Sequence, residues 1–335
     1  MFCHGGGTIK KGRRLPLFVF PLVVFCSLLH TLTATAKPAI NIGQYLQMGS
    51  YNGEPILWRC VDIDQHGPLM LSDRILTLKA FDAAGKHPDD HNNNRLSGGS
   101  SLWESSNIRA WLNSTAGAGN VKWPCGNPPA TDLASSGAQS RRWKKGGQYN
   151  SYVSEKGFLS EGNFRESERS VIKTVTQKSL LNSTDLKLAT SGNTLYFYHH
   201  DISYKISVPV KNYDTAYSHH VTDRMFLLDL MQIFRVNHNL KNYHLSKPSQ
   251  KAVTNSDFQS SDLASDRNWH YWLRSPFPTQ KYNNSVRYVT SMGYLFHVKA
   301  SSSYIGVRPA FYIDLSSARF KSGNGSLKNP YIIGP

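Results

Sequence analysis

The chain has 335 residues, 12% of them aromatic and 18% charged, and its formal net charge is +16 at pH 7. This composition is typical of a strand-rich globular domain and argues against a disordered chain or a helical bundle. A protein with this charge is attracted to anionic polymers of an envelope or a host surface. Its densest basic cluster, residues 141–145, lies in a glycine-rich loop without a nucleic-acid-binding motif, so we expect no nucleic-acid partner.

The first 36 residues contain the three parts of a secretory signal peptide in the usual order. Four cations between residues 10 and 14 precede an uncharged apolar run at 15–29, and the small residues Ala34 and Ala36 follow it. The run is shorter than the roughly 20 residues that a membrane-spanning helix needs. We therefore expect cleavage after Ala36 rather than an anchor, and no membrane span after cleavage. The mature protein is expected to be secreted or to stay in the periplasm or cell envelope.

Strand patterns begin the mature chain. Residues 42–49 and 56–63 are both strand-like, and a turn with Gly67 leads from the second of them into the apolar residues 68–72. Two apolar runs on either side of a glycine-containing turn predict a hairpin.

Three short helices are expected in the middle of the chain. The first begins at Ser105 or Ser106, either of which can cap it, and ends at Asn113. Its apolar face has helical spacing and consists of Ile108, Trp111 and Leu112. A second helix begins near Ser167, and a strand at the start of 221–236 runs into the third helix. The expected apolar residues of the second helix are Val171, Ile172 and Val175.

Residues 114–163 differ from their surroundings, because they are rich in Gly, Ser, Asn, Pro and Lys and show little periodicity. Long loops of this kind are usually functional or mobile. We interpret residues 37–320 as a single α+β domain of mixed antiparallel sheets and two or three short helices, with a large loop insertion at 114–163. A tyrosine-rich hairpin is expected at 195–210.

The C-terminal part has the clearest strand signals. Residues 271–276 are apolar, and two further runs, 286–291 and 294–300, are joined by a Met-Gly turn. This pairing around a glycine predicts a hairpin. Residues 306–315 are expected to form the final strand and residues 321–335 a C-terminal tail.

Five sequence blocks occur in one order along the chain. They are Trp58-Arg59, residues 103–113, residues 224–228, Trp-Leu-Arg-Ser-Pro at 272–276 and Gly-Val-Arg-Pro-Ala at 306–310. The series resembles a widespread bacterial domain of unknown function found in exported and surface proteins. That domain is distantly similar to the C-type-lectin-like fold of sulfatase-modifying enzymes, so the resemblance implies a C-type-lectin-like tendency, although a fold does not imply a function. Those enzymes would require a cysteine pair in the C-terminal half, and no cysteine follows Cys125.

Cys60 and Cys125 are the two cysteines beyond the signal peptide. An oxidising compartment allows a disulfide between them. The alternative is a buried free thiol at Cys60, because this residue shares a strand face with Ile56 and Trp58 and can pack as a small hydrophobic group. Both alternatives stay open at the level of sequence.

No catalytic, metal or cofactor site is indicated. The chain has neither a Gly-x-Ser-x-Gly nucleophile elbow nor a glycine-rich phosphate loop. Adjacent histidines occur at 199–200 and 219–220, but neighbours on a strand point to opposite faces, so each pair supplies at most one metal ligand. A triad of Ser, His and Asp assembled from distant residues is the enzymatic alternative.

Two arginines and a group of loop residues are candidate ligand contacts. Arg274 and Arg308 lie inside apolar strands, and a buried arginine must be paired. We expect them to hold the C-terminal sheet together, and the alternative is that they line a ligand groove. Tyr, Ser and Asn are frequent in adaptable recognition surfaces. The loop residues that we expect at such a surface are Tyr282, Asn283, Asn284, Ser301, Ser302 and Tyr304.

The sequence thus favours a non-enzymatic binding or adhesion module outside the cytoplasm, with a glycan, an anionic envelope polymer or a protein as its partner. The alternatives are a secreted hydrolase with spatially assembled catalytic residues and a structural envelope protein. A hydrolase should contain a polar pocket with acids or histidines of perturbed pKa. A structural protein should instead present a broad apolar patch.

Overall fold

The computed structural model of the protein describes residues 39–84, 93–124, 152, 154–186, 218–256, 258–278 and 280–334. The expected signal peptide at 1–36, the expected hairpin at 195–210 and Cys125 lie outside these ranges. Residues 37–335 form one unit, and its described part is an α+β fold built on three sheets. Within the described ranges, no helix combines the length and the apolar character needed to cross a membrane.

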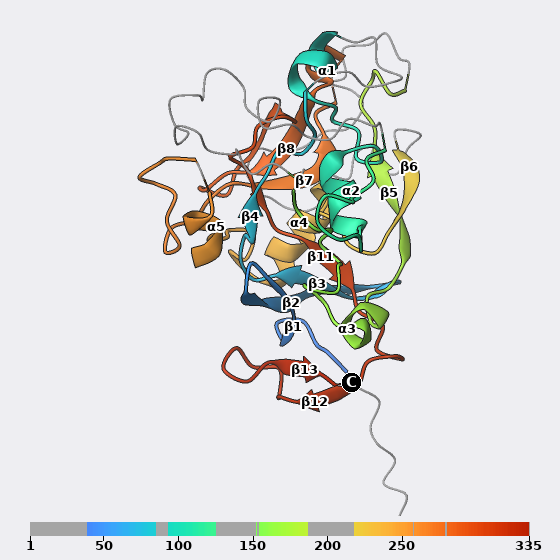
Figure 1. Ribbon diagram of the computed structural model, residues 1–335, viewed down its shortest axis with the longest axis vertical. Coiled ribbons are helices and arrows are strands. Elements are labelled where there is room, and N and C mark those ends of the chain that lie inside the picture. Colours follow the sequence, from blue (N-terminus) through green and yellow to red (C-terminus); the bar gives the residue numbers. More distant parts are fainter. Residues whose placement is uncertain are drawn as a thin grey trace, which may run out of the picture. The chain divides into compact units, whose positions relative to one another are not determined.

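The first three strands form the centre of a six-stranded sheet (Figure 1). They are β1 (Tyr45–Tyr51), β2 (Glu54–Asp64) and β3 (Gly67–Ser72), and each pairs antiparallel with the next. The turn between β1 and β2 consists of Asn52 and Gly53, both at positive φ, the conformation that tight hairpin turns require and that Asn and Gly adopt most readily. The three strands and the β2–β3 hairpin predicted from the sequence are confirmed.

The C-terminal residues complete this sheet. β11 (Ala310–Tyr312) pairs with β3, β13 (Tyr331–Ile333) pairs parallel with β1, and β12 (Phe320–Ser322) is the edge strand beside β13. The expectation that 321–335 is a tail is therefore wrong. Ile333 is only 1% exposed, so this segment buries apolar surface against the domain instead of extending from it.

The second sheet has five strands in the order β4-β10-β7-β8-β9. These are β4 (Thr77–Leu78), β7 (Tyr271–Pro276), β8 (Ser285–Val289), β9 (Leu295–Lys299) and β10 (Gly306–Val307). β8 and β9 are the predicted hairpin and pair antiparallel. At the other end of the sheet, the two-residue strands β4 and β10 pair with each other although they lie far apart in the sequence.

The single final strand expected at 306–315 is wrong, because this segment contributes to both large sheets. β10 pairs with β7 in the five-stranded sheet, and β11 pairs with β3 in the six-stranded sheet. Arg308 and Pro309 connect the two strands. Proline has no N–H for a strand ladder, and the Pro309 carbonyl accepts a hydrogen bond from the Ser72 N–H at 3.0 Å.

The third sheet is a two-stranded ribbon of β5 (Val175–Leu180) and β6 (Ser218–Asp223). The helix expected to begin near Ser167 is a short one, α3 (Glu166–Ser170), and its expected apolar residues lie beyond it. Those residues are β-branched, and β-branched side chains pack better on strands than in helices. Val175 accordingly begins β5.

Five short α-helices occur in the described ranges, more than the two or three expected. Besides α3 they are α1 (Asn93–Gly98), α2 (Asn107–Asn113), α4 (Leu230–Asn239) and α5 (Gln250–Thr254), with a 3-10 turn at Gln280–Tyr282. α2 agrees with the prediction, and the Ser106 hydroxyl caps it by accepting the Arg109 N–H. α4 contacts both β2 and β7, so it joins the two large sheets (Figure 1).

Four tryptophans that are completely buried lie at the centre of the core. Each indole N–H has an acceptor, as buried tryptophans require. Trp58 donates to the Met48 carbonyl at 2.8 Å, Trp272 to the Lys79 carbonyl at 2.8 Å, Trp103 to Asp223 Oδ2 at 2.9 Å and Trp111 to the Lys156 carbonyl at 3.1 Å. These bonds tie strands and helices from distant parts of the chain to one core.

Cys60 is a buried free thiol. Its Sγ lies 3.6 Å from the Asp62 carbonyl, and burial raises the pKa of the thiol to about 12. The disulfide alternative is therefore not realised at Cys60, which packs as a small hydrophobic group. The described C-terminal part of the expected insertion also belongs to the core, since Tyr152 and Phe158 are buried and pack against the Trp111 ring.

Candidate functional site

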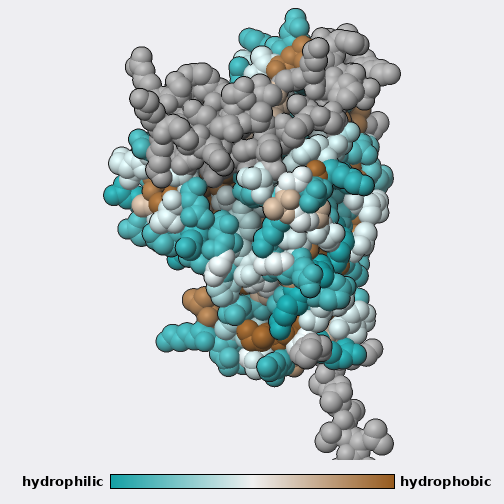
Figure 2. Space-filling model, viewed as in Figure 1, coloured by the Kyte–Doolittle hydropathy of each residue, from teal (hydrophilic) through white to brown (hydrophobic). Residues whose placement is uncertain are grey.

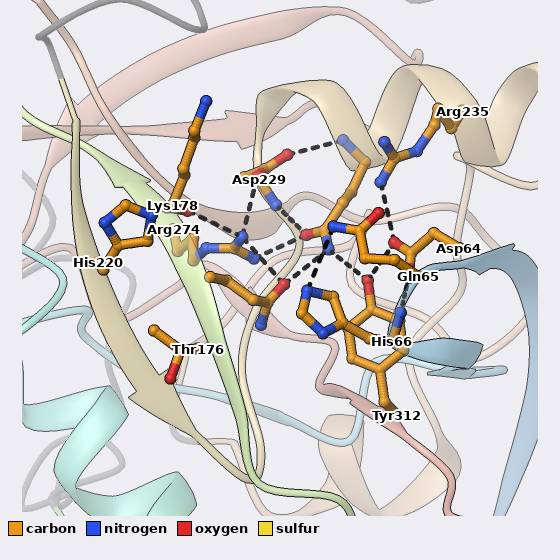
Figure 3. A pocket seen from close by; sticks show the side chains of 12 residues that line it. Asp64, Gln65, His66, Thr176, Lys178, His220, Asp229, Arg235, Arg274 and Tyr312 are labelled. Atoms are coloured by element: carbon orange, nitrogen blue, oxygen red, sulfur yellow. Dashed lines mark hydrogen bonds and ion pairs between the residues drawn. The ribbon is translucent and has the colours of Figure 1, made fainter.

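A polar cavity of about 350 Å³ opens where the β5–β6 ribbon, the start of α4 and the β2–β3 turn meet (Figure 3). All three sheets contribute to it. Its lining residues are Asp64, Gln65, His66, Thr176, Gln177, Lys178, His220, Asp229, Gln232, Arg235, Arg274 and Tyr312. The cavity is therefore assembled by the tertiary fold and not by any single motif.

Arg274 of β7 is the centre of a buried hydrogen-bond network in one wall. Its Nη2 lies 2.9 Å from Asp229 Oδ2, and its Nη1 donates to Gln232 Oε1 at 2.7 Å and to the Leu227 carbonyl at 2.6 Å. Asp229 is also the N-cap of α4, and its Oδ1 accepts the Gln232 N–H at 2.7 Å. Gln232 Oε1 in turn accepts the Asp229 N–H at 3.0 Å, which completes a capping box. The start of α4 is thus held rigidly against β7.

The network continues across the floor of the cavity to the six-stranded sheet. Gln232 Nε2 donates to Gln177 Oε1 at 3.1 Å and lies 3.4 Å from the Tyr312 hydroxyl. Tyr312 donates to Asp64 Oδ2 at 2.6 Å. Burial, together with the hydrogen bond to Asp64, raises the pKa of Tyr312, so the phenol stays neutral and acts as a fixed donor. Asp64 also accepts the His66 N–H at 2.9 Å, which positions the turn.

The carboxylates of the cavity are already engaged. Asp229 is paired with Arg274, and Arg235 lies 2.7 Å from Asp62 and 3.6 Å from Asp64. Both carboxylate oxygens of Asp64 and both of Asp229 accept hydrogen bonds from protein groups. Among the described residues, no cluster of three or more His, Cys, Asp or Glu side chains could hold a metal ion.

The mouth of the cavity offers a different set of groups. Gln65, Thr176 and His220 are exposed, while His66 and Lys178 are partly exposed. Amide, hydroxyl and imidazole groups both donate and accept hydrogen bonds, and the Lys178 ammonium donates them. A rigid, internally satisfied floor with adaptable polar groups at the rim is the arrangement of a binding site for a polar small molecule.

The two arginines that the sequence singled out are both buried, at 2% for Arg274 and 1% for Arg308. Arg274 lines the cavity and also holds its wall, so the two readings of this residue coincide. Arg308 lies away from the cavity. Its Nε donates to the Ser72 carbonyl at 2.9 Å and its Nη1 to the Tyr243 carbonyl at 3.0 Å. Arg308 therefore bonds to backbone carbonyls, as a structural role requires.

The loop residues expected at a recognition surface are not brought together with Arg274. Tyr282 is 39% exposed and Tyr304 is partly buried, stacked on Phe258 at 5.4 Å. Asn283 and Asn284 are buried, at 0% and 6%, so their expected surface position is wrong. The same holds for two serines of this set, Ser301 and Ser302, each 1% exposed.

The burial of Asn283 and Asn284 has a structural cause. The Asn283 carbonyl accepts hydrogen bonds from Arg95 Nε at 3.2 Å and from the Ser101 hydroxyl at 2.5 Å. Asn284 Nδ2 donates to the Asn94 carbonyl at 2.9 Å. α1 and the residues after it therefore cover the β7–β8 connection, and the side-chain amide nitrogens of Asn283 and Asn284 bond to protein groups.

Most residues of the cavity were not identified from the sequence. A usable signal existed for Asp229 and Gln232, because an Asp followed three residues later by a Gln before an apolar run is a capping box. His220 belongs to a histidine pair that the sequence did show. Asp64, Thr176 and Tyr312 have no local signal, since they meet only when the three sheets assemble.

Comparison with known protein families gives a match over residues 66–315 to the family described as "Domain of unknown function (DUF6273)". The chain belongs to the DUF6273 family. The matched range contains both arginine blocks and every residue of the cavity except Asp64 and Gln65. The predicted resemblance to a domain of unknown function is confirmed at this level. No curated protein and no solved structure matches the chain.

Proposed function

We propose that this DUF6273 protein is a non-enzymatic binding module that works outside the cytoplasm and holds a hydroxyl-rich ligand, a glycan, in the polar cavity. The observation that supports this most is the Arg274 network. It fixes the cavity wall from within, while Gln65, Thr176 and His220 at the rim are exposed and can bond to a ligand. A site whose polar groups are fixed before binding loses less entropy when the ligand arrives.

The balance of charge favours a neutral polar ligand. Arg274 is opposed by Asp229, and Arg235 is opposed by Asp62 and Asp64. Lys178 is the third cation of the lining, so three positive groups face three carboxylates and the cavity combines donors and acceptors without an excess of formal charge. Sugar hydroxyls both donate and accept, so they match such a lining better than a phosphate or sulfate polymer does. The volume of about 350 Å³ lies within the range of small-molecule sites.

The exported bacterial origin and the C-type-lectin-like fold belong to the same proposal. The sequence pattern of residues 1–36 supports export, and residues 37–335, which have a formal charge of +12 without the four cations of that segment, would be retained near an anionic surface. A structural envelope role receives less support. On the face drawn in Figure 2, the described surface has only small, separate apolar areas. Assembly into an envelope structure would need a broad apolar patch.

A glycan-array screen of residues 37–335, run at low and at high salt, tests the proposal. We expect binding that persists at high salt, because the contacts are hydrogen bonds between neutral groups. His220→Ala should weaken the affinity about tenfold, the effect of one lost hydrogen bond. His238→Ala is the matched control, since His238 is exposed on α4 and does not line the cavity. Absence of binding at both salt concentrations, together with turnover of an ester or glycoside, would support the hydrolase alternative and contradict the proposal.

A further inference from the structure

A second polar site lies at the other end of the β2–β3 hairpin. Two cavities of about 210 and 250 Å³ open there, and both are lined by Asp73 and Arg74, the residues that follow β3. Because the cavities share these two residues, they are neighbouring parts of one groove, which we call the Arg74 groove. All of its lining residues lie in the described part of the chain.

The Arg74 guanidinium is held in place from one side only. Its Nη1 donates to the Pro248 carbonyl at 3.2 Å and to the Ser265 carbonyl at 2.8 Å. Nε and Nη2 form no hydrogen bond with the described residues, and the side chain is exposed. A guanidinium that presents Nε and Nη2 together can bind a carboxylate through two parallel hydrogen bonds. The two carbonyl contacts therefore hold the Arg74 guanidinium in place and leave Nε and Nη2 available to a carboxylate.

The neighbouring acid does not neutralise this fork. Asp73 Oδ1 accepts the Tyr243 hydroxyl at 2.9 Å. The Arg308 guanidinium lies over the Tyr243 ring at 4.7 Å, and no described carboxylate lies within ion-pair distance of Arg308. Arg308 is a buried cation that needs a counter-charge. Asp73 acts on it electrostatically and is linked to it through Tyr243.

The two halves of the groove differ in chemistry. The smaller half is lined by apolar residues, among them Ile56, Leu57 and Leu76, and also by Tyr51, Glu54 and Ser249. The larger half is lined by the amides Asn242 and Asn268 and by Lys247. Arg74 lies where the two halves join. A ligand that suits this arrangement has a carboxylate at its centre, a short apolar group on one side and hydrogen-bonding amides on the other.

We propose that the Arg74 groove binds the C-terminal carboxylate of a peptide whose last residue is apolar. The carboxylate lies across Nε and Nη2 of Arg74, with the Lys247 ammonium adding positive charge nearby. The last side chain occupies the apolar half, next to Ile56 and Leu76. The preceding peptide groups lie along the amide half, where Asn242 and Asn268 can bond to them. This site is separate from the glycan cavity and does not depend on the proposed function.

Arg308 prepares the groove without lining it. It bonds to the carbonyls of Ser72 and Tyr243, which are the neighbours of Asp73 and Asn242 on the two walls. The spacing between these walls is therefore fixed from the core. Preorganised walls favour binding because little ordering remains to be done when the ligand enters.

Titration of residues 37–335 with N-acetyl-Gly-Gly-Leu, followed by calorimetry or NMR, tests the proposal. The probe with a free carboxylate should bind at least about tenfold more tightly than its C-terminal amide, because charge-assisted hydrogen bonds are lost in the amide. Equal affinity of the two probes, or no binding of the acid at millimolar concentration, would overturn the proposal. This comparison uses the unaltered chain, so it does not depend on the folding of any variant.

Arg74→Lys supplies the second test. It retains the charge but removes the fork, and we expect at least about a fivefold loss of acid binding. Arg267→Lys is the matched control, because Arg267 is exposed, faces Asp262 and lies outside the groove. Thermal unfolding of both variants checks that the contacts to Pro248 and Ser265 are not needed for folding. Unchanged acid binding in folded Arg74→Lys would contradict the proposal. His220→Ala should leave acid binding unchanged, and Arg74→Lys should leave glycan binding unchanged, so either proposal can fail alone.

Discussion

Replacement of Arg274 by methionine should destabilise the protein strongly. The side chains of Arg274 and Asp229 are only 3% and 5% exposed, and they lie 2.9 Å apart. Methionine fills part of the volume but leaves the Asp229 carboxylate buried without its cation. Breaking a buried ion pair in this way costs about 3–5 kcal/mol. For a domain of this size we expect Tm to fall by roughly 5–8 °C.

A double-mutant cycle isolates the charge pair from the lost packing. Asp229→Asn removes the negative charge but keeps a residue that can cap α4, since asparagine is as good an N-cap as aspartate. In Arg274→Met/Asp229→Asn neither charge remains buried. The combined loss of stability should therefore be smaller than the sum of the single losses by about 2 kcal/mol or more.

Urea unfolding of residues 37–335, followed by circular dichroism, measures all four free energies of unfolding. Arg267→Met is the matched control, because it breaks an ion pair whose side chains are 60% and 78% exposed. Exposed pairs contribute little, so this control should change stability by no more than about 0.5 kcal/mol. Additive single losses, or a loss below about 1 kcal/mol for Arg274→Met, would refute the assignment of Arg274 as the staple of the cavity wall.

Two further predictions concern buried titratable groups. Burial lowers the pKa of His270 to about 4, below the value of about 6.5 expected in the unfolded chain. The unfolded state therefore binds more protons between pH 6.5 and 4, and stability should fall by up to about 3 kcal/mol as the pH is lowered through this window. His270→Asn should flatten this dependence in unfolding experiments at a series of pH values, and an unchanged slope would contradict the reasoning. The second prediction concerns Cys60, whose thiol has a pKa raised to about 12 by burial. It should not react with a thiol reagent at pH 8 until denaturant is added, and mass spectrometry of the labelled Cys60 peptide measures this; rapid labelling of the native protein would show that the residue is accessible.

The elements that the sequence predicted well are those held by local interactions. β2 and β3 are joined by a short turn, β8 and β9 by a turn around Gly293, and α2 is capped by its own preceding serine. In each case the alternation of apolar residues and the turn or cap chemistry lie within a few residues of each other. The C-terminal residues were misread for the opposite reason. β13 has only three residues, and polar residues precede it in the chain. It forms a strand because it pairs with β1, which lies at the opposite end of the domain's sequence.

The same distinction explains the candidate site. Asn283 and Asn284 were expected at the surface because polar residues between two strands usually face solvent. They are buried because α1 supplies the bonding partners, and α1 lies nearly 190 residues earlier in the chain. The cavity residues Thr176, Arg274 and Tyr312 come from three different sheets. No periodicity along the chain can indicate that they converge.

The two arginine blocks of the DUF6273 match are informative in a way that their sequence alone did not show. The sequence left open whether Arg274 and Arg308 are structural or face a ligand groove. Each one is a buried staple, and each bonds to backbone carbonyls of a loop that forms the wall of a polar cavity. A guanidinium suits this position because its rigid fork of donors bonds to several carbonyls at once. The arginines therefore maintain the shape of the two cavities, and the ligand contacts that we propose fall to side chains beside them, such as His220 and Arg74.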